Sequence, residues 1–164
     1  MAYLLDTSVF ITARRVHYGF DFCPGFWDWI HEQHRAGVVF SIARVFDELR
    51  AQQDELADWA GDLPEGFFLE ASAATVSSYA AVSTWASSQR YRTPAINDFL
   101  QTADYHLVAQ ANQGGHVVVT YEVPRGSDKQ IKIPDACLGL RVGCILPHDM
   151  LRRERARFVL GART

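Results

Sequence analysis

Two patterns of apolar and polar positions alternate along the chain. Short apolar runs, typical of strands buried inside a parallel sheet, occur at Ala2 to Leu5, Val38 to Ser41 and His116 to Thr120. Lys129 to Ile133 and Arg141 to Ile145 are expected to form further strands or extended segments. Apolar residues at helical spacing, bounded by Gly and Pro, predict helices over Ser8 to Arg15, Phe26 to Ala36, Ala43 to Trp59, Ala71 to Gln89, Thr93 to Gly114 and Asp149 to Leu160.

The order of these elements predicts the fold class. Strands alternate with helices, and parallel strands need helical crossovers, so we expect an α/β sandwich with a mainly parallel central sheet. The chain has 164 residues, a length that favours a single domain over residues 1–164. In such sheets ligands bind outside the carboxyl ends of the strands, so candidate chemistry is sought there.

Composition narrows the function classes. Hydrophobic residues make up 48% of the chain and aromatic residues 12%, which argues against a disordered protein. The formal charge of −3 does not indicate a nucleic-acid binder, although a local basic patch could serve that role. No apolar run reaches the ~18 residues of a membrane span. The N-terminus lacks the pattern of a secretory signal, so a cytoplasmic location is expected.

Four acidic residues accompany the predicted strands. Asp6 directly follows the first strand in "YLLDTSVF", and Glu122 follows the strand that ends at Thr120. Glu48 lies on the helix after the second strand, and Asp104 lies on the helix before the third. The chain contains only two lysines that could pair with them. Clustered carboxylates repel one another unless a cation joins them, and Mg²⁺ or Mn²⁺ prefers oxygen ligands.

Each acid also has a simpler interpretation. Asp6, or the hydroxyl residues behind it, could cap the following helix. Glu48 could be a solvated helix residue with Asp47 as its competitor, and Glu122 could be an ordinary turn acid. Asp104 shares a helix face with apolar residues, where a carboxylate is costly to bury without a partner, or it could be exposed.

Four stretches together resemble the PIN domain. They are "YLLDTSVF", "VVFSIARVFDELR", "TADYHLVAQANQGGHVVVTYE" and "IKIPDACLGLRVGCILPHDML", which cover nearly the whole chain in the expected order. The greatest similarity is to a prokaryotic PIN-like group related to VapC-type toxins. The phosphatases of the haloacid-dehalogenase type are disfavoured, because they carry Asp-x-Asp after the first strand, where this chain has Asp6-Thr7-Ser8.

The resemblance implies a fold, an activity and a set of site residues. PIN domains are three-layer α/β/α sandwiches and Mg²⁺- or Mn²⁺-dependent endoribonucleases. By position, Asp6, Glu48 and Asp104 are the first three acids, and Glu122 falls where many PIN domains have an aspartate. Asp135 in "IPDAC" is an alternative fourth metal ligand. Ser8 and Thr120 match the hydroxyl positions that orient the site or the attacking water.

The resemblance also implies partners. An RNA substrate, a cognate antitoxin protein and a homodimer are expected, with no membrane association. The alternative is a catalytically degenerate PIN-like module that binds RNA or a protein. Basic segments that could meet phosphates are Arg14-Arg15, Arg90 to Arg92 and Leu151 to Phe158, although a solvated terminal helix explains the last equally well.

Overall fold

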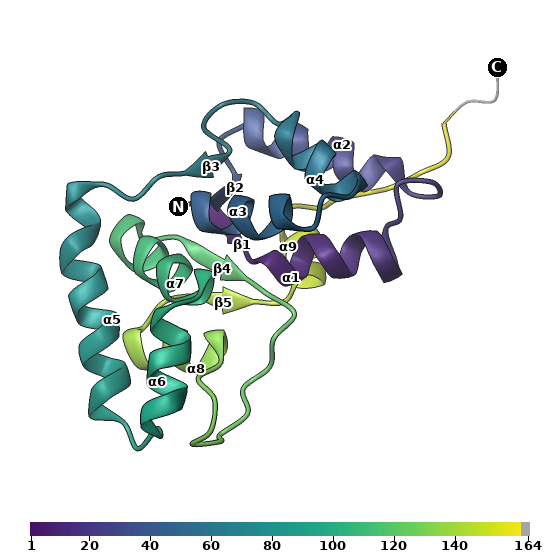
Figure 1. Ribbon diagram of the computed structural model, residues 1–164. Helices are drawn as coiled ribbons and strands as arrows, with labels where there is room; N and C mark the ends of the chain where they lie inside the picture. The colour runs from purple at the N-terminus through teal and green to yellow at the C-terminus, as the bar shows by residue number, and fades with distance from the viewer. Residues whose placement is uncertain (162–164) are drawn as a thin grey trace.

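Five parallel strands form the centre of the molecule in the computed structural model, which describes residues 1–161 (Figure 1). The sheet order is β3-β2-β1-β4-β5, and every pairing is parallel. The strands are β1 (Tyr3–Leu5), β2 (Val39–Ile42), β3 (Phe68–Leu69), β4 (Val117–Val119) and β5 (Cys144–Ile145). The expected α/β/α sandwich with a mainly parallel sheet is therefore confirmed.

Helices cover both faces of this sheet. Figure 1 shows α1, α2, α4 and α9 gathered on one side of the strands, and α5, α6, α7 and α8 on the other. The α-helices are α1 (Thr7–Thr12), α2 (Pro24–Arg35), α3 (Ala43–Ala51), α4 (Glu55–Gly61), α5 (Val76–Ser88), α6 (Thr93–Leu100), α7 (Ala103–Gly114), α8 (Ile133–Leu140) and α9 (Pro147–Arg153). A π-helical segment, η1 (Ala13–His17), extends α1, and a 3₁₀ turn, η2 (Ala73–Thr75), precedes α5. No helix within residues 1–161 combines the length and apolar character needed to cross a bilayer.

Aromatic side chains hold the first group of helices on the sheet. Phe10 of α1 is fully buried and lies 5.8 Å from the ring of Trp59 on α4, centroid to centroid. Trp59 in turn lies 4.7 Å from Trp27 of α2. Phe67, next to β3, contacts Phe10 at 6.4 Å. These contacts fix α1, and with it the position of Asp6 at the start of that helix.

Several predicted boundaries were wrong. The helix expected over Ala43 to Trp59 is two helices, because Gln53 has a left-handed φ of 50° and Asp54 caps α4 by accepting the Ala57 N–H at 3.0 Å. The helix expected over Thr93 to Gly114 is likewise α6 and α7, separated at Gln101 and Thr102.

The C-terminal third differs more. Lys129 to Ile133 is not a strand, and Ile133 begins helix α8, which the sequence did not suggest. Only Cys144–Ile145 of the segment expected over Arg141 to Ile145 is a strand. The terminal helix ends at Arg153 and does not reach Leu160. Strand β3 was not foreseen, because two residues give no periodic signal.

Gly139 of α8 packs against Trp85 of α5. A Cβ at this position would overlap the indole of Trp85. We therefore expect Gly139→Ala to lower the free energy of unfolding by about 1–3 kcal/mol, the usual cost of overpacking. Urea unfolding would measure the change. Gly61→Ala, at the end of α4 where a Cβ meets nothing within 4 Å, is the matched control and should unfold within about 0.5 kcal/mol of the wild type. Equal stability of the two variants would contradict the packing described.

Candidate functional site

The candidate site lies where β1 and β4 end side by side. Leu5 of β1 pairs with Val119 of β4, so Asp6 and Thr120 are the first residues beyond two adjacent strand ends. The Asp6 N–H donates to the Val119 carbonyl at 2.9 Å, which continues the pairing by one step. The chain order of the sheet reverses between these two strands. Parallel α/β sheets bind ligands in the crevice at such a reversal.

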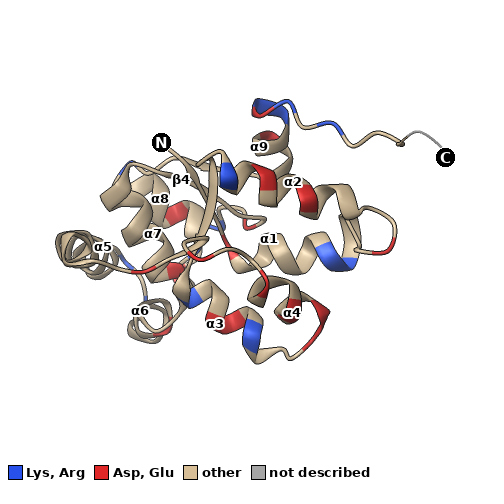
Figure 2. Ribbon diagram, turned by 90° about the horizontal axis from the view of Figure 1, so that it is seen from above, with Lys and Arg blue, Asp and Glu red and all other residues tan. Residues whose placement is uncertain are grey.

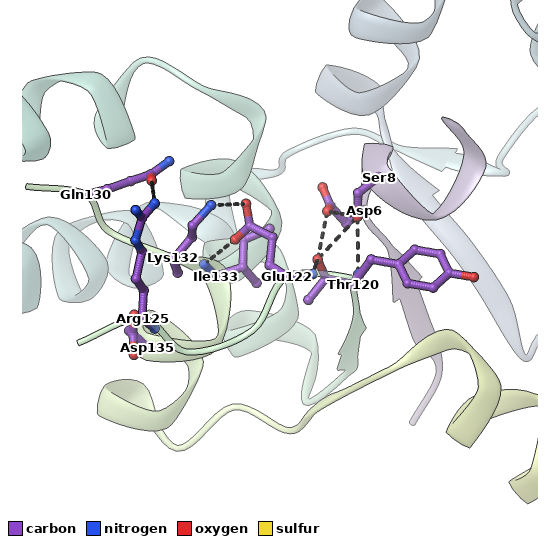
Figure 3. Close-up of polar contacts among 10 residues, drawn as sticks. Asp6, Ser8, Thr120, Glu122, Arg125, Gln130, Lys132, Ile133 and Asp135 are labelled. Atoms are coloured by element: carbon purple, nitrogen blue, oxygen red, sulfur yellow. Dashed lines mark hydrogen bonds and ion pairs between the residues drawn. The ribbon is translucent and has the colours of Figure 1, made fainter. Parts of the chain in front are cut away.

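Two hydroxyl groups hold the Asp6 carboxyl group. Ser8 Oγ donates to Asp6 Oδ2 at 2.6 Å, and Thr120 Oγ1 donates to the same oxygen at 2.8 Å. These hydroxyls also accept backbone N–H bonds, Ser8 from Tyr121 at 3.2 Å and Thr120 from Glu122 at 3.0 Å. Figure 3 shows these hydrogen bonds, which join the segment after β4 to the start of α1. Ser8 and Thr120 therefore fix one oxygen of Asp6.

Asp6 stands at the start of helix α1. It occupies the N-cap position of α1, but within the described residues its side chain makes no capping hydrogen bond. The side chain is almost completely buried, and this burial raises the pKa of Asp6, while hydrogen bonds from Ser8 and Thr120 oppose the rise. The backbone N–H groups of Thr7 and Ser8 also lower the pKa of Asp6, so its carboxyl group faces both the start of the helix and the two hydroxyls.

The pKa of Asp104 is raised by burial and by the charges of three other acids. It lies in the first turn of α7 and is half-buried. Burial is the largest cause that raises the pKa of Asp104 to about 8, followed by the negative charges of Asp6, Glu122 and Glu48, while Lys132 lowers it. Like charges raise a carboxyl pKa in this way only when they are near. The charges of Asp6, Glu48 and Glu122 therefore act on Asp104, in the region where Thr7 contacts Glu48 and Thr120 contacts Asp6.

Glu48 and Glu122 are anchored differently from Asp6. Glu48, exposed on α3, accepts a hydrogen bond from Thr7 Oγ1 of α1 at 2.5 Å. Glu122 Oε2 accepts the N–H of Ile133 at 2.8 Å, which caps α8, and its Oε1 lies 3.6 Å from Lys132 Nζ. Sequence reasoning missed Thr7 and Lys132 as contributors. Thr7 stands next to Asp6 in the chain, and Lys132 precedes a Pro at the start of a helix, a signal that could have placed it.

Asp135 does not join these acids. It lies in the first turn of α8, and its Oδ2 is 3.5 Å from the backbone nitrogen of Arg125, at the limit of a hydrogen bond. It is not among the charges that shift the pKa of Asp104. In Figure 3 it lies beside Arg125, away from Asp6. By contrast, the Glu122 N–H donates to Thr120, which in turn donates to Asp6.

The four carboxylates are the kind of ligand that a hard cation prefers, but their side chains do not form a complete metal site. Four carboxylates supply only oxygen ligands, and Lys132 is the cation that lowers the pKa of Asp104. In the part of the chain that the structure describes, no three His, Cys, Asp or Glu side chains are close enough together to hold a metal ion. Basic and acidic residues are otherwise spread over the ribbon (Figure 2), so the site is marked by convergence and not by an acidic surface.

Comparison with protein families gives one match. The family model described as a domain of unknown function (DUF4411) matches residues 3–158, which include all of the acids discussed above. Neither the curated proteins nor the solved structures contain a match to the chain.

Proposed function

The chain belongs to the family of the domain of unknown function DUF4411, and we propose that it is a PIN-like endoribonuclease dependent on Mg²⁺ or Mn²⁺. One observation carries this proposal. Burial, and then the negative charges of Asp6, Glu122 and Glu48, raise the pKa of Asp104 to about 8, beside the point where the strand order of a parallel sheet reverses. Such a group of acids is unfavourable by itself and becomes favourable when a divalent cation binds.

The residues of the site have separate tasks in this proposal. Asp6, Glu48, Asp104 and Glu122 would hold the cation through their carboxylate oxygens. When bound, such an ion supplies a nucleophile from water and stabilises charge on a phosphoryl oxygen. Ser8 and Thr120 keep one Asp6 oxygen fixed by donating to it, and Thr7 does the same for Glu48. The half-buried Asp104 would hold the cation in its ionised form, which a nearby positive charge favours.

A degenerate module is the second candidate, and one observation favours it. The carboxylate of Glu122 already pairs with Lys132 and accepts the Ile133 N–H. Among residues 1–161, no three His, Cys, Asp or Glu side chains are close enough together to hold a metal ion. This arrangement suits a protein that binds RNA or another protein without cutting. The two candidates differ in one property, which is metal-dependent hydrolysis.

Incubation with RNA distinguishes them. Purified protein would be mixed with single-stranded RNA of mixed sequence in Mn²⁺, in Mg²⁺ or in EDTA, and the products separated on a denaturing gel. Internal fragments should form with either metal and not with EDTA. Intact RNA under all three conditions, with the protein shown to be folded by circular dichroism, would support the degenerate module. Equal cleavage in EDTA would contradict the metal-dependent mechanism.

Further expectations depend on the same proposal. A ribonuclease acting on cellular transcripts belongs in the cytoplasm. The resemblance to VapC-type toxins predicts a cognate antitoxin and a homodimer. These remain predictions, and co-expression with the protein encoded by the neighbouring reading frame would test the first of them.

A further inference from the structure

A small cavity adjoins the acid site. It lies between α6 and the loop that connects β4 to α8, and its volume is about 280 Å³. Asp104 lines it together with Thr102, so the cavity and the acids share a wall. On the loop side it is bounded by Arg125, Lys129 and Gln130. A ligand in this cavity would therefore lie directly beside the acids.

The cations of this cavity lack acidic partners. Arg14 pairs with Asp54 at 3.0 Å and Arg92 with Asp128 at 3.0 Å, so these two arginines are neutralised within the protein. Within residues 1–161, neither Arg125 nor Lys129 lies within 4.0 Å of a carboxylate oxygen, although Asp98 and Asp104 line the same cavity.

Arg125 is also held loosely. Its Nη1 lies 3.5 Å from Gln130 Oε1, a long hydrogen bond that costs little to replace. Arg125 and Lys129 are therefore available for an anionic ligand. Arginine in particular suits a phosphate group.

The floor of the cavity is apolar. Ala95 and Phe99 of α6 and Ile131 of the loop line it, and all three are buried. The carboxylate of Asp98, on α6, and the amide of Gln130, on the loop, also line the cavity and could meet the edge of a ring. An apolar floor with a few convergent polar groups is the usual form of a site for a flat organic group. The volume is slightly below the range of about 300–1,000 Å³ found for small-molecule sites, so one such group fits and a base pair does not.

We propose that this cavity binds one unpaired nucleotide of a single-stranded RNA, with its base on Phe99 and Ile131 and its phosphate on Arg125 and Lys129. This inference rests on the proposed ribonuclease function and names its substrate as single-stranded. In Figure 3 Arg125 and Gln130, then the Glu122–Lys132 pair, then Asp6 follow one another across the view. An extended strand that enters the cavity reaches the acids at the adjoining phosphate. A duplex cannot follow the same path without unpairing a base.

Binding without metal tests this inference separately from catalysis. The probe is a nine-nucleotide RNA of mixed sequence with a 3′ fluorescein, and anisotropy is measured in EDTA at low salt, where no hydrolysis is expected. Arg125→Ala/Lys129→Ala should weaken binding about tenfold and reduce the slope of log K against log salt by about 1.4, which is 0.7 for each lost phosphate contact on a single strand. The blunt duplex of the same sequence should bind the wild type at least about tenfold more weakly.

The matched control removes two charges elsewhere. Arg35→Ala/Arg50→Ala changes exposed residues of α2 and α3, outside the basic segments named above, and should bind within about twofold of the wild type. Equal binding by the two double variants, equal binding of duplex and single strand, or no measurable binding by the wild type would overturn the inference. Binding that depends on Arg125 and Lys129 without any cleavage in Mn²⁺ would support the nucleotide site and refute the proposed hydrolysis. Cleavage that continues unchanged in Arg125→Ala/Lys129→Ala would refute the nucleotide site alone.

Discussion

Asp6→Asn is expected to reduce Mn²⁺-dependent RNA cleavage by at least about 100-fold, equivalent to about 2.7 kcal/mol of lost transition-state stabilisation. The amide keeps the size of the carboxyl group and can still accept from Ser8 and Thr120, so the local structure should persist. It removes one negative charge and one ligand oxygen from the centre of the acid site. Initial rates on a fluorogenic single-stranded RNA, with thermal unfolding as a check on folding, would measure the loss.

Asp135→Asn is the control for that result. Asp135 is an acid of the same region, but it faces the backbone nitrogen of Arg125 and stands apart from the four converging acids. Its amide variant should retain activity within about threefold. If Asp135→Asn lost as much activity as Asp6→Asn, the fourth ligand would be Asp135 and not Glu122. Full activity in Asp6→Asn would refute the site itself.

Asp104→Asn is expected to stabilise the metal-free protein at pH 8. Folding raises the pKa of Asp104 from 3.8 to about 8, mainly through burial and then through the charges of Asp6, Glu122 and Glu48. Below about pH 4 the folded and unfolded states both keep the proton, and the residue costs nothing. Between pH 4 and pH 8 only the unfolded state loses it, so the free energy of unfolding falls as the pH rises.

The size of this effect follows from the pKa difference. Each unit corresponds to 1.36 kcal/mol, and after reduction by about half for partial exposure the cost at pH 8 is about 2–3 kcal/mol. An amide does not titrate, so Asp104→Asn should show a much smaller fall between pH 5 and pH 8. Urea unfolding in EDTA at these two values would measure it. Asp47→Asn, an exposed acid on α3, should keep the pH dependence of the wild type.

Adding Mn²⁺ at pH 8 should make the wild type more stable than Asp104→Asn, the reverse of the order expected without metal. A cation bound to the acids removes the cost of ionising Asp104, so Mn²⁺ should raise the unfolding temperature of the wild type at pH 8 and have little effect on Asp104→Asn. A wild-type protein whose stability in EDTA is the same at pH 5 and pH 8 would contradict the convergence of the four acids.

The strands and the acids behind them were readable from the sequence because both depend on local signals. Apolar runs located β1, β2 and β4 to within one or two residues, and the parallel arrangement then required Asp6 and Thr120 to be neighbours. The hydroxyls of Ser8 and Thr120 were assigned an orienting role before their partners were known.

Other features depend on tertiary structure and left little trace in the sequence. The break at Gln53 is a single left-handed residue inside a helical pattern, and β3 is defined by its partner Ser41–Ile42 more than by its own two residues. The hydrogen bond from the Ile133 N–H to the Glu122 carboxylate depends on α8, a helix that the sequence did not predict. The cavity beside Asp104 is bounded by the loop that connects β4 to α8, so no local sequence pattern predicts it.

The bond between Thr120 and Asp6 joins residues that are 114 positions apart, and it has a consequence for how the protein is made. A ribosome synthesises Asp6 and Ser8 long before Thr120, the second hydroxyl that orients Asp6, and long before Glu122. The central strand β1 likewise waits for β4 before both of its edges are paired. A nascent chain that has not reached residue 122 therefore holds no assembled acid site.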